Sequence, residues 1–359
     1  MVLIGARRPA MELASGATWR QADPEDPAAM RAALDGVDAV VEIAACTDVQ
    51  EVLGVEPRLR RATLLRRARA VLEAAAASDV RHVVVVTSAM VFGALPDNPV
   101  PLPEDAPVRA ALDDGLVGDL VEVERLVTEF AGRGGRTGGR VDGRTGGRAG
   151  GRAGGRVPGS TVCTVLRPAA LVGPGVDTPS TRQFEAPRLL AVRGARTAWQ
   201  FCHVQDLAAA ALTCLESELG GVFSVGSPGW LKPAEVERLS GMRRVEVPLR
   251  LAFGTAERLH RVGVLAAPAE DLAYVVHPWV VGASRLLAAG WVPRYSNQDC
   301  LAVLLEEVHR HRTGVIRRPD RRDAALGAAG AAVALVGTAA LVRQARRRRH
   351  GRGISGSTT

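Results

Sequence analysis

The chain has 359 residues, enough for one large domain or two ordinary ones, and 47% of them are hydrophobic, which supports a sizeable core. Its net charge of +8 comes from two arginine-rich segments, because residues 132–156 and residues 343–352 carry +6 each and leave about −4 for the rest. We therefore expect no nucleic-acid-binding face on the folded part. Five scattered cysteines without a CxxC pair predict reduced thiols and no metal site.

The first third of the chain alternates strand-like and helix-like segments. Residues 2–8 predict a short strand that runs into a basic turn, and residues 39–45 predict another strand. Between them, Asp26 is a good N-cap, Pro27 suits the first helical position and Gly36 can end the helix. Residues 57–77 predict a long helix, with apolar side chains on one side and arginines on the other. This alternation is typical of βαβ units and predicts a parallel sheet.

The most informative stretch is the run of four valines at residues 83–86. Four consecutive β-branched residues indicate a strand that is buried on both faces, as in the inner part of a parallel sheet. Thr87 and Ser88 follow, and ligands of open α/β sheets collect at the carboxyl ends of such strands. Their hydroxyls either point into a binding crevice or belong to an ordinary turn, and the stretch alone does not decide between the two.

The second half of the chain offers weaker signals. Residues 116–130 predict a helix and residues 161–166 a strand, while the Gly-Arg repeat between them, residues 132–156, predicts a disordered surface insertion. An RNA-binding role for this repeat is not favoured, because it has no interleaved aromatic residues. Asp206 is expected to cap the alanine-rich helix that follows it, and His203 to be a structural hydrogen-bonding residue.

Residues 324–342 form a stretch of 19 residues without a charge, and the basic tail of residues 343–359 follows. The length suits a membrane span, but the stretch is mostly Ala and Gly. A C-terminal anchor, a segment lying on the membrane surface and a loosely ordered helix all remain open. No signal peptide precedes the first strand-like run, so we expect a cytoplasmic protein, with attachment to the inner face of the membrane if the stretch is an anchor.

Five segments in this order resemble the extended short-chain dehydrogenases/reductases, the NAD-dependent epimerase/dehydratase family, over residues 2–310: ADP, GVDAVVEIAA, VLEAAAASDVRHVVVVTSAMVFG, LRPAALVGPG and WQFCHVQDLAAAAL. The resemblance implies an α/β fold, with a Rossmann-like doubly wound parallel sheet and a smaller C-terminal substrate domain. It also implies an NAD or NADP cofactor and a small-molecule substrate, often a nucleotide sugar, whose hydroxyl or carbonyl is oxidised or reduced.

The resemblance assigns roles to nine residues. Ser88 matches the catalytic serine that hydrogen-bonds the substrate oxygen. Eight others match cofactor-binding positions, namely Arg7, Arg8, Asp23, Ala44, Ala45, Thr87, Arg167 and Pro168. Asp23 would meet the adenine ring, Ala44 and Ala45 would lie along the cofactor, and Arg167 and Pro168 would pass the nicotinamide. The arginine pair at residues 7 and 8 favours NADP over NAD, because arginine accommodates the extra phosphate.

Two departures from the family concern its chemistry and its first strand. Hydride transfer in the family uses a Tyr and a Lys four residues later on one helix, where the cation lowers the phenol pKa. Leu116 and Leu120 stand at those positions, and the nearby Asp113, Asp114 and Asp119 are expected to be solvated helix-start charges. The chain also begins where the family's second strand would be, without a GxxGxxG turn.

A missing first strand would leave the middle of the sheet open. Each unpaired buried backbone group would cost about 1–3 kcal/mol. Either the true start lies about 30 residues upstream, where the first strand and glycine turn of the family would stand, or the chain is a degenerate copy.

We therefore expect an NAD(P)-binding domain over residues 1–230, a substrate region interleaved with it over 231–312, a membrane-associated helix over 324–342 and a basic tail over 343–359. Three functions compete. They are an epimerase/dehydratase-type oxidoreductase with weakened catalysis, a non-catalytic NAD(P)- or metabolite-binding protein, and an RNA- or membrane-surface adaptor. The candidate partners are a small-molecule substrate, a second copy of the chain and a membrane, and a nucleic acid is not expected.

Overall fold

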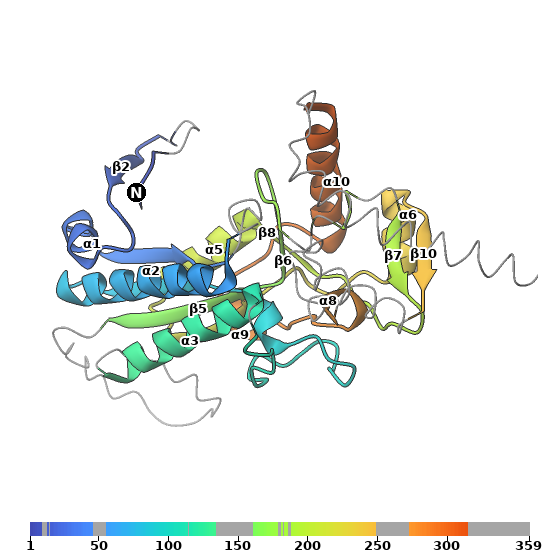
Figure 1. Cartoon of the computed structure of the whole chain (residues 1–359), viewed down its shortest axis with the longest axis horizontal. Coiled ribbons are helices and arrows are strands. Elements are labelled where there is room, and N and C mark those ends of the chain that lie inside the picture. Colours follow the sequence, from blue (N-terminus) through green and yellow to red (C-terminus); the bar gives the residue numbers. More distant parts are fainter. Residues whose placement is uncertain are drawn as a thin grey trace, which may run out of the picture.

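The centre of the molecule is a parallel β-sheet (Figure 1). The computed structural model describes residues 1–8, 13, 15–45, 55–113, 115–133, 161–178, 181, 183–185, 188–248 and 273–314. Four strands form the sheet in the order β3 (Ala39–Ile43), β4 (His82–Val86), β5 (Val162–Pro168) and β9 (Gly221–Val225). All three strand pairs are parallel. The predicted α/β class with a parallel sheet is confirmed.

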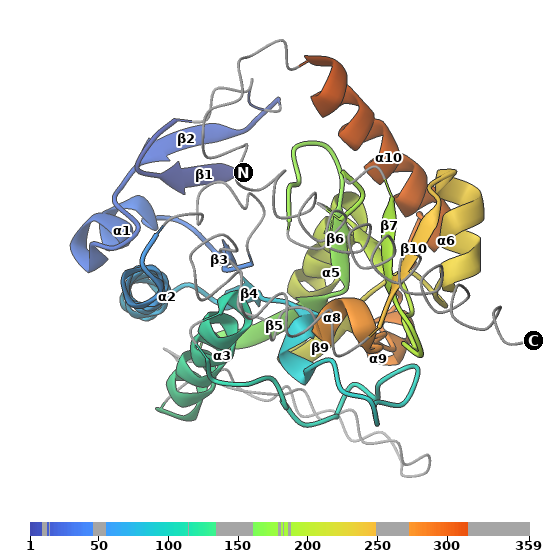
Figure 2. The same ribbon diagram turned by 45° about the vertical axis from the view of Figure 1, so that its right-hand side comes forward.

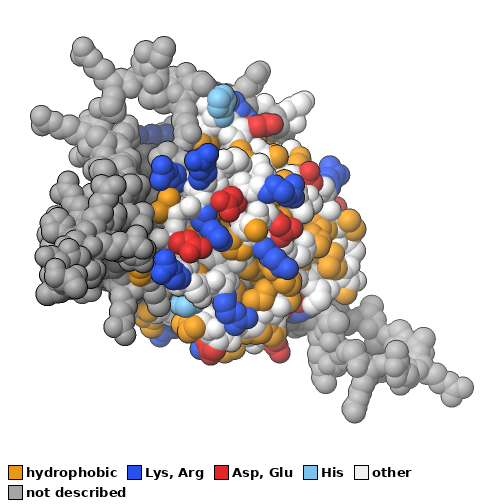
Figure 3. Space-filling model, turned by 90° about the vertical axis from the view of Figure 1, so that its right-hand side faces the viewer, with side chains coloured by type: hydrophobic (Ala, Val, Ile, Leu, Met, Phe, Trp, Pro, Cys, Tyr) orange, Lys and Arg blue, Asp and Glu red, His pale blue; other side chains and the backbone are white. Residues whose placement is uncertain are grey.

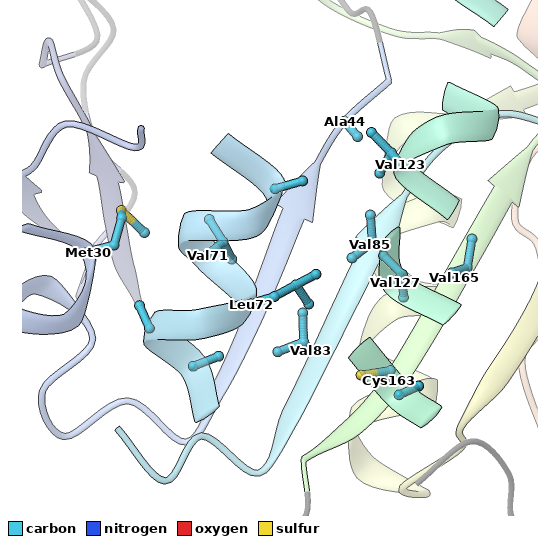
Figure 4. Packing of buried hydrophobic residues seen from close by; sticks show 14 of the residues in the cluster. Met30, Ala44, Val71, Leu72, Val83, Val85, Val123, Val127, Cys163 and Val165 are labelled. Carbon is cyan, nitrogen blue, oxygen red and sulfur yellow. The ribbon is translucent and has the colours of Figure 1, made fainter. Parts of the chain in front are cut away.

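The valine run forms β4, which is buried along its whole length as predicted. Val83 and Val85 belong to a core cluster with α2 (Pro57–Ala77) and α3 (Leu116–Arg133), whereas Val84 and Val86 pack in another cluster with α5 (Val204–Glu216). Figure 4 shows Val83 and Val85 facing the side chains of α2 and α3. Successive residues of a strand point to opposite faces, so β4 is covered by helices on both sides.

Local signals at helix starts set the first two helices. α1 spans Pro27–Ala33, and the Asp26 carboxylate caps it by accepting a hydrogen bond from the Ala28 N–H at 2.9 Å. α2 spans Pro57–Ala77, as predicted, and the Glu56 carboxylate accepts from the Leu59 N–H at 2.9 Å. α3 begins at Leu116, as predicted, and continues three residues beyond the expected end, to Arg133.

Strands β1 (Val2–Gly5) and β2 (Thr18–Gln21) form a separate parallel pair. Figures 1 and 2 show this pair apart from the four-stranded sheet. Among the described residues, neither β1 nor β2 pairs with a strand of the four-stranded sheet. Val41 and Ile43, which point to the same face of β3, are 45% and 47% exposed. Met30 of α1 packs in the same core cluster as Val71 of α2 and so ties this end to the rest (Figure 4).

A second hydrophobic core lies towards the opposite end of the molecule from β1 and β2 (Figure 2). Two further parallel strand pairs occur there, β6 (Ala170–Val172) with β8 (Phe201–His203) and β7 (Leu189–Val192) with β10 (Arg244–Val247). The remaining elements are η2 (Ala89–Phe92), α6 (Pro233–Ser240), α8 (Ala273–Val276), α9 (Ser284–Ala288) and α10 (Asn297–Gly314). Because this core takes residues from both before and after β9, the two halves of the molecule are interleaved in sequence.

The start of α5 corrects one prediction. His203, not Asp206, is its N-cap residue, and the His203 Nδ1 accepts a hydrogen bond from the Gln205 N–H at 3.2 Å. Asp206 lies buried in the first turn, where its carboxylate accepts from the backbone N–H groups of Arg294 at 2.8 Å and Tyr295 at 3.1 Å. Asp206 therefore joins α5 to the segment that precedes α10, and the structural role expected of His203 is confirmed.

The structure also describes part of the charged surface and four of the five cysteines. On the face seen in Figure 3, Lys and Arg side chains are interspersed with Asp and Glu. No helix among the described ranges combines the length and apolar character that a bilayer span needs. Residues 134–160 and 315–359, with the Gly-Arg repeat and the uncharged stretch, lie outside those ranges. Cys163, Cys202, Cys214 and Cys300 are buried free thiols, and burial raises the pKa of Cys163 to about 11.

Candidate active site

A cavity that is partly open to solvent lies at the carboxyl ends of β4 and β5. Ala45, Thr87, Ser88 and Pro168 form its wall on the side of the sheet. This is the edge at which ligands of open parallel sheets bind. Both Thr87 and Ser88 line the cavity, but Thr87 is fully buried and its hydroxyl bonds within the protein, so only the Ser88 hydroxyl of this pair is placed to meet a ligand.

Ser88 is placed by the turn that ends β4. Its backbone is extended, and its Oγ accepts a hydrogen bond from the Met90 N–H at 3.2 Å, so that Ser88 caps the short helix η2. The side chain is partly buried and lines the cavity. Among the described residues, no acceptor takes the hydroxyl hydrogen of Ser88, which leaves this O–H available to a ligand oxygen.

Thr87 is fixed from behind by a buried ion pair. Its Oγ1 donates to Glu124 Oε1 at 2.7 Å, and Glu124 in turn accepts from the Arg167 guanidinium at 2.6 and 3.1 Å. The side chains of Glu124 and Arg167 are each 8% exposed, and the guanidinium also lies 4.6 Å from the centre of the Phe92 ring. Arg167 is thus bound to Glu124 and does not line the cavity, whereas the neighbouring Pro168 does.

The positions at which the resemblance requires a tyrosine and a lysine face this cavity. Leu116 and Leu120, in the first two turns of α3, both line it. The one tyrosine in the described lining is Tyr274, which comes from α8 and donates its hydroxyl hydrogen to the Met90 carbonyl at 2.8 Å. The cavity wall therefore has aliphatic side chains where the family places its proton-transfer pair.

Asp119 corrects a second prediction. It is not a solvated helix-start charge, because its side chain is only 2% exposed and lies between two arginines of α2. Its carboxylate accepts from Arg60 Nε at 2.6 Å and from Arg61 Nε at 2.8 Å. Asp113 is half-buried and accepts from the Gly115 N–H at 2.9 Å, while Asp114 lies outside the described ranges. Asp119 therefore holds α3 against α2 and takes no part in the cavity.

The predicted cofactor residues fall into two groups. Ala45, Thr87 and Pro168 line the cavity, and Ala44 lies buried beside them, with the N–H groups of both alanines bonded to the Val86 carbonyl. Arg7, Arg8 and Asp23 are exposed at the end of the β1–β2 pair and do not line the cavity. The far wall includes Trp199, Tyr274 and Trp279. No spacing in the sequence indicates these three, because they come together only through long-range contacts.

The residues present fit one end of a dinucleotide. Small and uncharged side chains at the ends of β3, β4 and β5 suit a nicotinamide ring. The starts of α1 and α2 do not suit its pyrophosphate, because the Asp26 and Glu56 carboxylates cap these helices and would repel phosphate there. Within the described ranges, no three side chains are grouped as metal ligands.

Two comparisons of the sequence with known proteins concern the first part of the chain and its overall similarity. Residues 5–119 match a family model described as NAD(P)H-binding. An uncharacterized protein of Mycobacterium tuberculosis is 25% identical over 288 residues, which are 79% of this chain and 69% of the relative.

Similar solved structures include the UDP-glucose-4-epimerase of Stenotrophomonas maltophila with bound NAD and formylated UDP-arabinopyranose. It is 18% identical with a TM-score of 0.58, over 83% of this chain and 84% of that one. A dTDP-glucose 4,6-dehydratase double mutant from Streptomyces venezuelae with bound NAD is 15% identical with a TM-score of 0.56, over 84% and 82%. Residues 5–119 therefore match an NAD(P)H-binding family model, and the chain has the fold of these epimerase and dehydratase structures, as the sequence predicted.

Proposed function

We propose that this protein is an NAD(P)-dependent oxidoreductase that acts slowly on a hydroxyl or carbonyl of a small molecule. The observation that carries the proposal is the cavity at the carboxyl ends of β4 and β5, where the available Ser88 hydroxyl lies in a domain that matches an NAD(P)H-binding family. The nicotinamide, when bound, supplies or accepts the hydride. In this proposal Ser88 binds the substrate oxygen, and Ala45, Thr87 and Pro168 flank the nicotinamide ring.

The remaining predicted residues would bind the other end of the cofactor. Asp23 would meet the adenine, and the exposed arginines at positions 7 and 8 would bind the 2′-phosphate of NADP. If so, the chain prefers NADPH to NADH, and replacing both arginines with alanine removes the preference. Titration of each reduced cofactor, followed by nicotinamide fluorescence, measures this directly. Equal affinity of the unmodified chain for the two cofactors would rule out this role of the arginines.

Catalysis is expected to be weak because the walls of the cavity lack the usual proton-transfer pair. A positioned general acid or base contributes about 10²–10⁴-fold to a rate. Leu116 and Leu120 supply neither a proton nor a cation that would lower the pKa of a phenol. The same two leucines favour a second candidate function, a non-catalytic protein that binds NAD(P) or a metabolite on the same fold.

Restoring the pair distinguishes the two candidates. We expect the double variant Leu116→Tyr with Leu120→Lys to raise the rate at which NADPH reduces a carbonyl probe such as benzylacetone by about 10²-fold or more. The matched control is Leu112→Tyr, at a position that is 56% exposed and does not line the cavity. Cofactor binding without any measurable hydride transfer, in the unmodified chain and in the double variant, would establish the non-catalytic alternative.

A further inference from the structure

The lining of the cavity is uncharged wherever the structure describes it. Its side chains are aliphatic, aromatic, hydroxyl or amide groups, without an Asp, Glu, Lys, Arg or His among them. Two tryptophans, Trp199 and Trp279, stand in the far wall, and Leu116 and Leu120 of α3 form another side. A ligand that carries a diphosphate would find no described cation here, because the nearby guanidinium of Arg167 already pairs with Glu124.

Most polar side chains of the lining are already bonded within the protein. Five pairings involve its hydroxyl and amide groups: Thr87 with Glu124, Thr178 with Thr181, Thr197 with the Val275 carbonyl, Gln200 with the Ser227 carbonyl and the backbone of Val281, and Tyr274 with the Met90 carbonyl. The indole N–H of Trp279 donates to the Tyr274 carbonyl at 3.1 Å. Gln183 also interacts within the protein. Ser88 remains as the described lining side chain with a hydroxyl hydrogen to give.

We propose that the cavity binds an uncharged, largely apolar molecule with a single carbonyl or hydroxyl oxygen, which accepts a hydrogen bond from Ser88. The position of that oxygen beside the nicotinamide rests on the proposed function, but the apolar character of the ligand rests on the cavity wall alone. Burying an apolar body against leucine and tryptophan side chains is favourable, whereas phosphate oxygens would lose their water without gaining a partner. Nucleotide sugars, which the similar epimerase structures bind, are therefore disfavoured.

Calorimetric titration of the full chain tests the proposal with defined probes. Benzylacetone, 2-undecanone and 2-acetylnaphthalene represent neutral carbonyl compounds, and UDP-glucose represents a nucleotide sugar. We expect saturable binding of at least one carbonyl probe and none of UDP-glucose. Leu116→Arg places a cation in the cavity. It should lower the affinity for the carbonyl probe at least about tenfold, because the apolar body of the probe would then lie against a charge. Leu112→Arg, at an exposed position outside the lining, should change the affinity for the same probe by less than about twofold.

Each result has a definite meaning. Saturable binding of UDP-glucose that is tighter than that of the carbonyl probes overturns the inference, and so does failure of all three carbonyl probes up to their solubility limits. Equal effects of Leu116→Arg and Leu112→Arg would show that the probe binds elsewhere. If circular dichroism shows that Leu116→Arg does not fold, Leu116→Gln provides the same comparison. A separate titration with NADPH keeps the two proposals apart, because a chain that binds the carbonyl probe but no cofactor retains this inference and loses the proposed function.

Discussion

The buried pair of Glu124 and Arg167 provides a sharp test of how the site is supported. Replacing Glu124 with Gln keeps the volume and an acceptor for Thr87 but removes the negative charge beside a guanidinium whose side chain is 8% exposed. Breaking a buried ion pair at one partner costs about 3–5 kcal/mol. Since domains are stable by about 5–15 kcal/mol, this is a large part of the total. It corresponds to a fall in Tm of about 6–20 °C at about 2–4 °C per kcal/mol.

Urea unfolding followed by circular dichroism measures this loss, and the same helix provides the control. Glu122 also pairs with an arginine, Arg125, at 3.1 Å, but the two side chains are 26% and 59% exposed. Glu122→Gln should therefore cost no more than about 1 kcal/mol. If the two substitutions changed the free energy of unfolding equally, the burial argument would be refuted. Glu124→Leu combined with Arg167→Leu should recover most of the loss, because no buried charge is then left without a partner.

Three further predictions concern stability. Asp119→Ala should lower the free energy of unfolding by about 3–5 kcal/mol, because two α2 arginines lose their buried partner; a cost below about 1 kcal/mol in urea unfolding would contradict it. Gly118→Ala should cost about 1–3 kcal/mol, since a Cβ there would collide with the Asp113 carbonyl, and an unchanged Tm would exclude this crowding. Burial lowers the pKa of His82 below its usual 6.5, so the unfolded chain binds more protons as the pH falls. Stability should then be fully present above pH 6.5 and decline below it, by up to about 1.4 kcal/mol per pH unit for this residue. The urea midpoint of unfolding should fall less steeply from pH 7.5 to 5.5 in His82→Gln than in the unmodified chain. Identical slopes for the two proteins would disprove this role of His82.

The features that the sequence predicts correctly are those set by residues close together in the chain. α1 and α2 begin where a carboxylate precedes a proline, and each carboxylate bonds an N–H two or three residues on. The burial of β4 follows from its own four valines, and the place of Thr87 and Ser88 follows from the direction of parallel strands. Each of these signals lies within a few residues, so tertiary structure does not have to be known.

The features that the sequence does not predict depend on distant partners. Asp119 looks like a surface residue at a helix start until α2 brings two arginines, 58 and 59 residues earlier in the chain, against it. Asp206 fits an N-cap by type, but backbone groups 88 and 89 residues away take its carboxylate. The far wall of the cavity is assembled in the same way, from segments whose sequences show no periodicity that could relate them to Ser88.

The outer side of β3 also bears on how the molecule behaves at high concentration. A strand with unbonded backbone groups along one side can recruit a strand from another molecule, and exposed valine and isoleucine side chains favour such growth. Glu42 stands in the middle of this strand with its side chain turned inward, where it is buried and pairs with Arg67 at 2.8 Å. An inward charge at the border of a sheet is one of the devices by which proteins resist fibrillar stacking. We therefore expect Glu42, paired with Arg67, to oppose the addition of a strand from another molecule at β3.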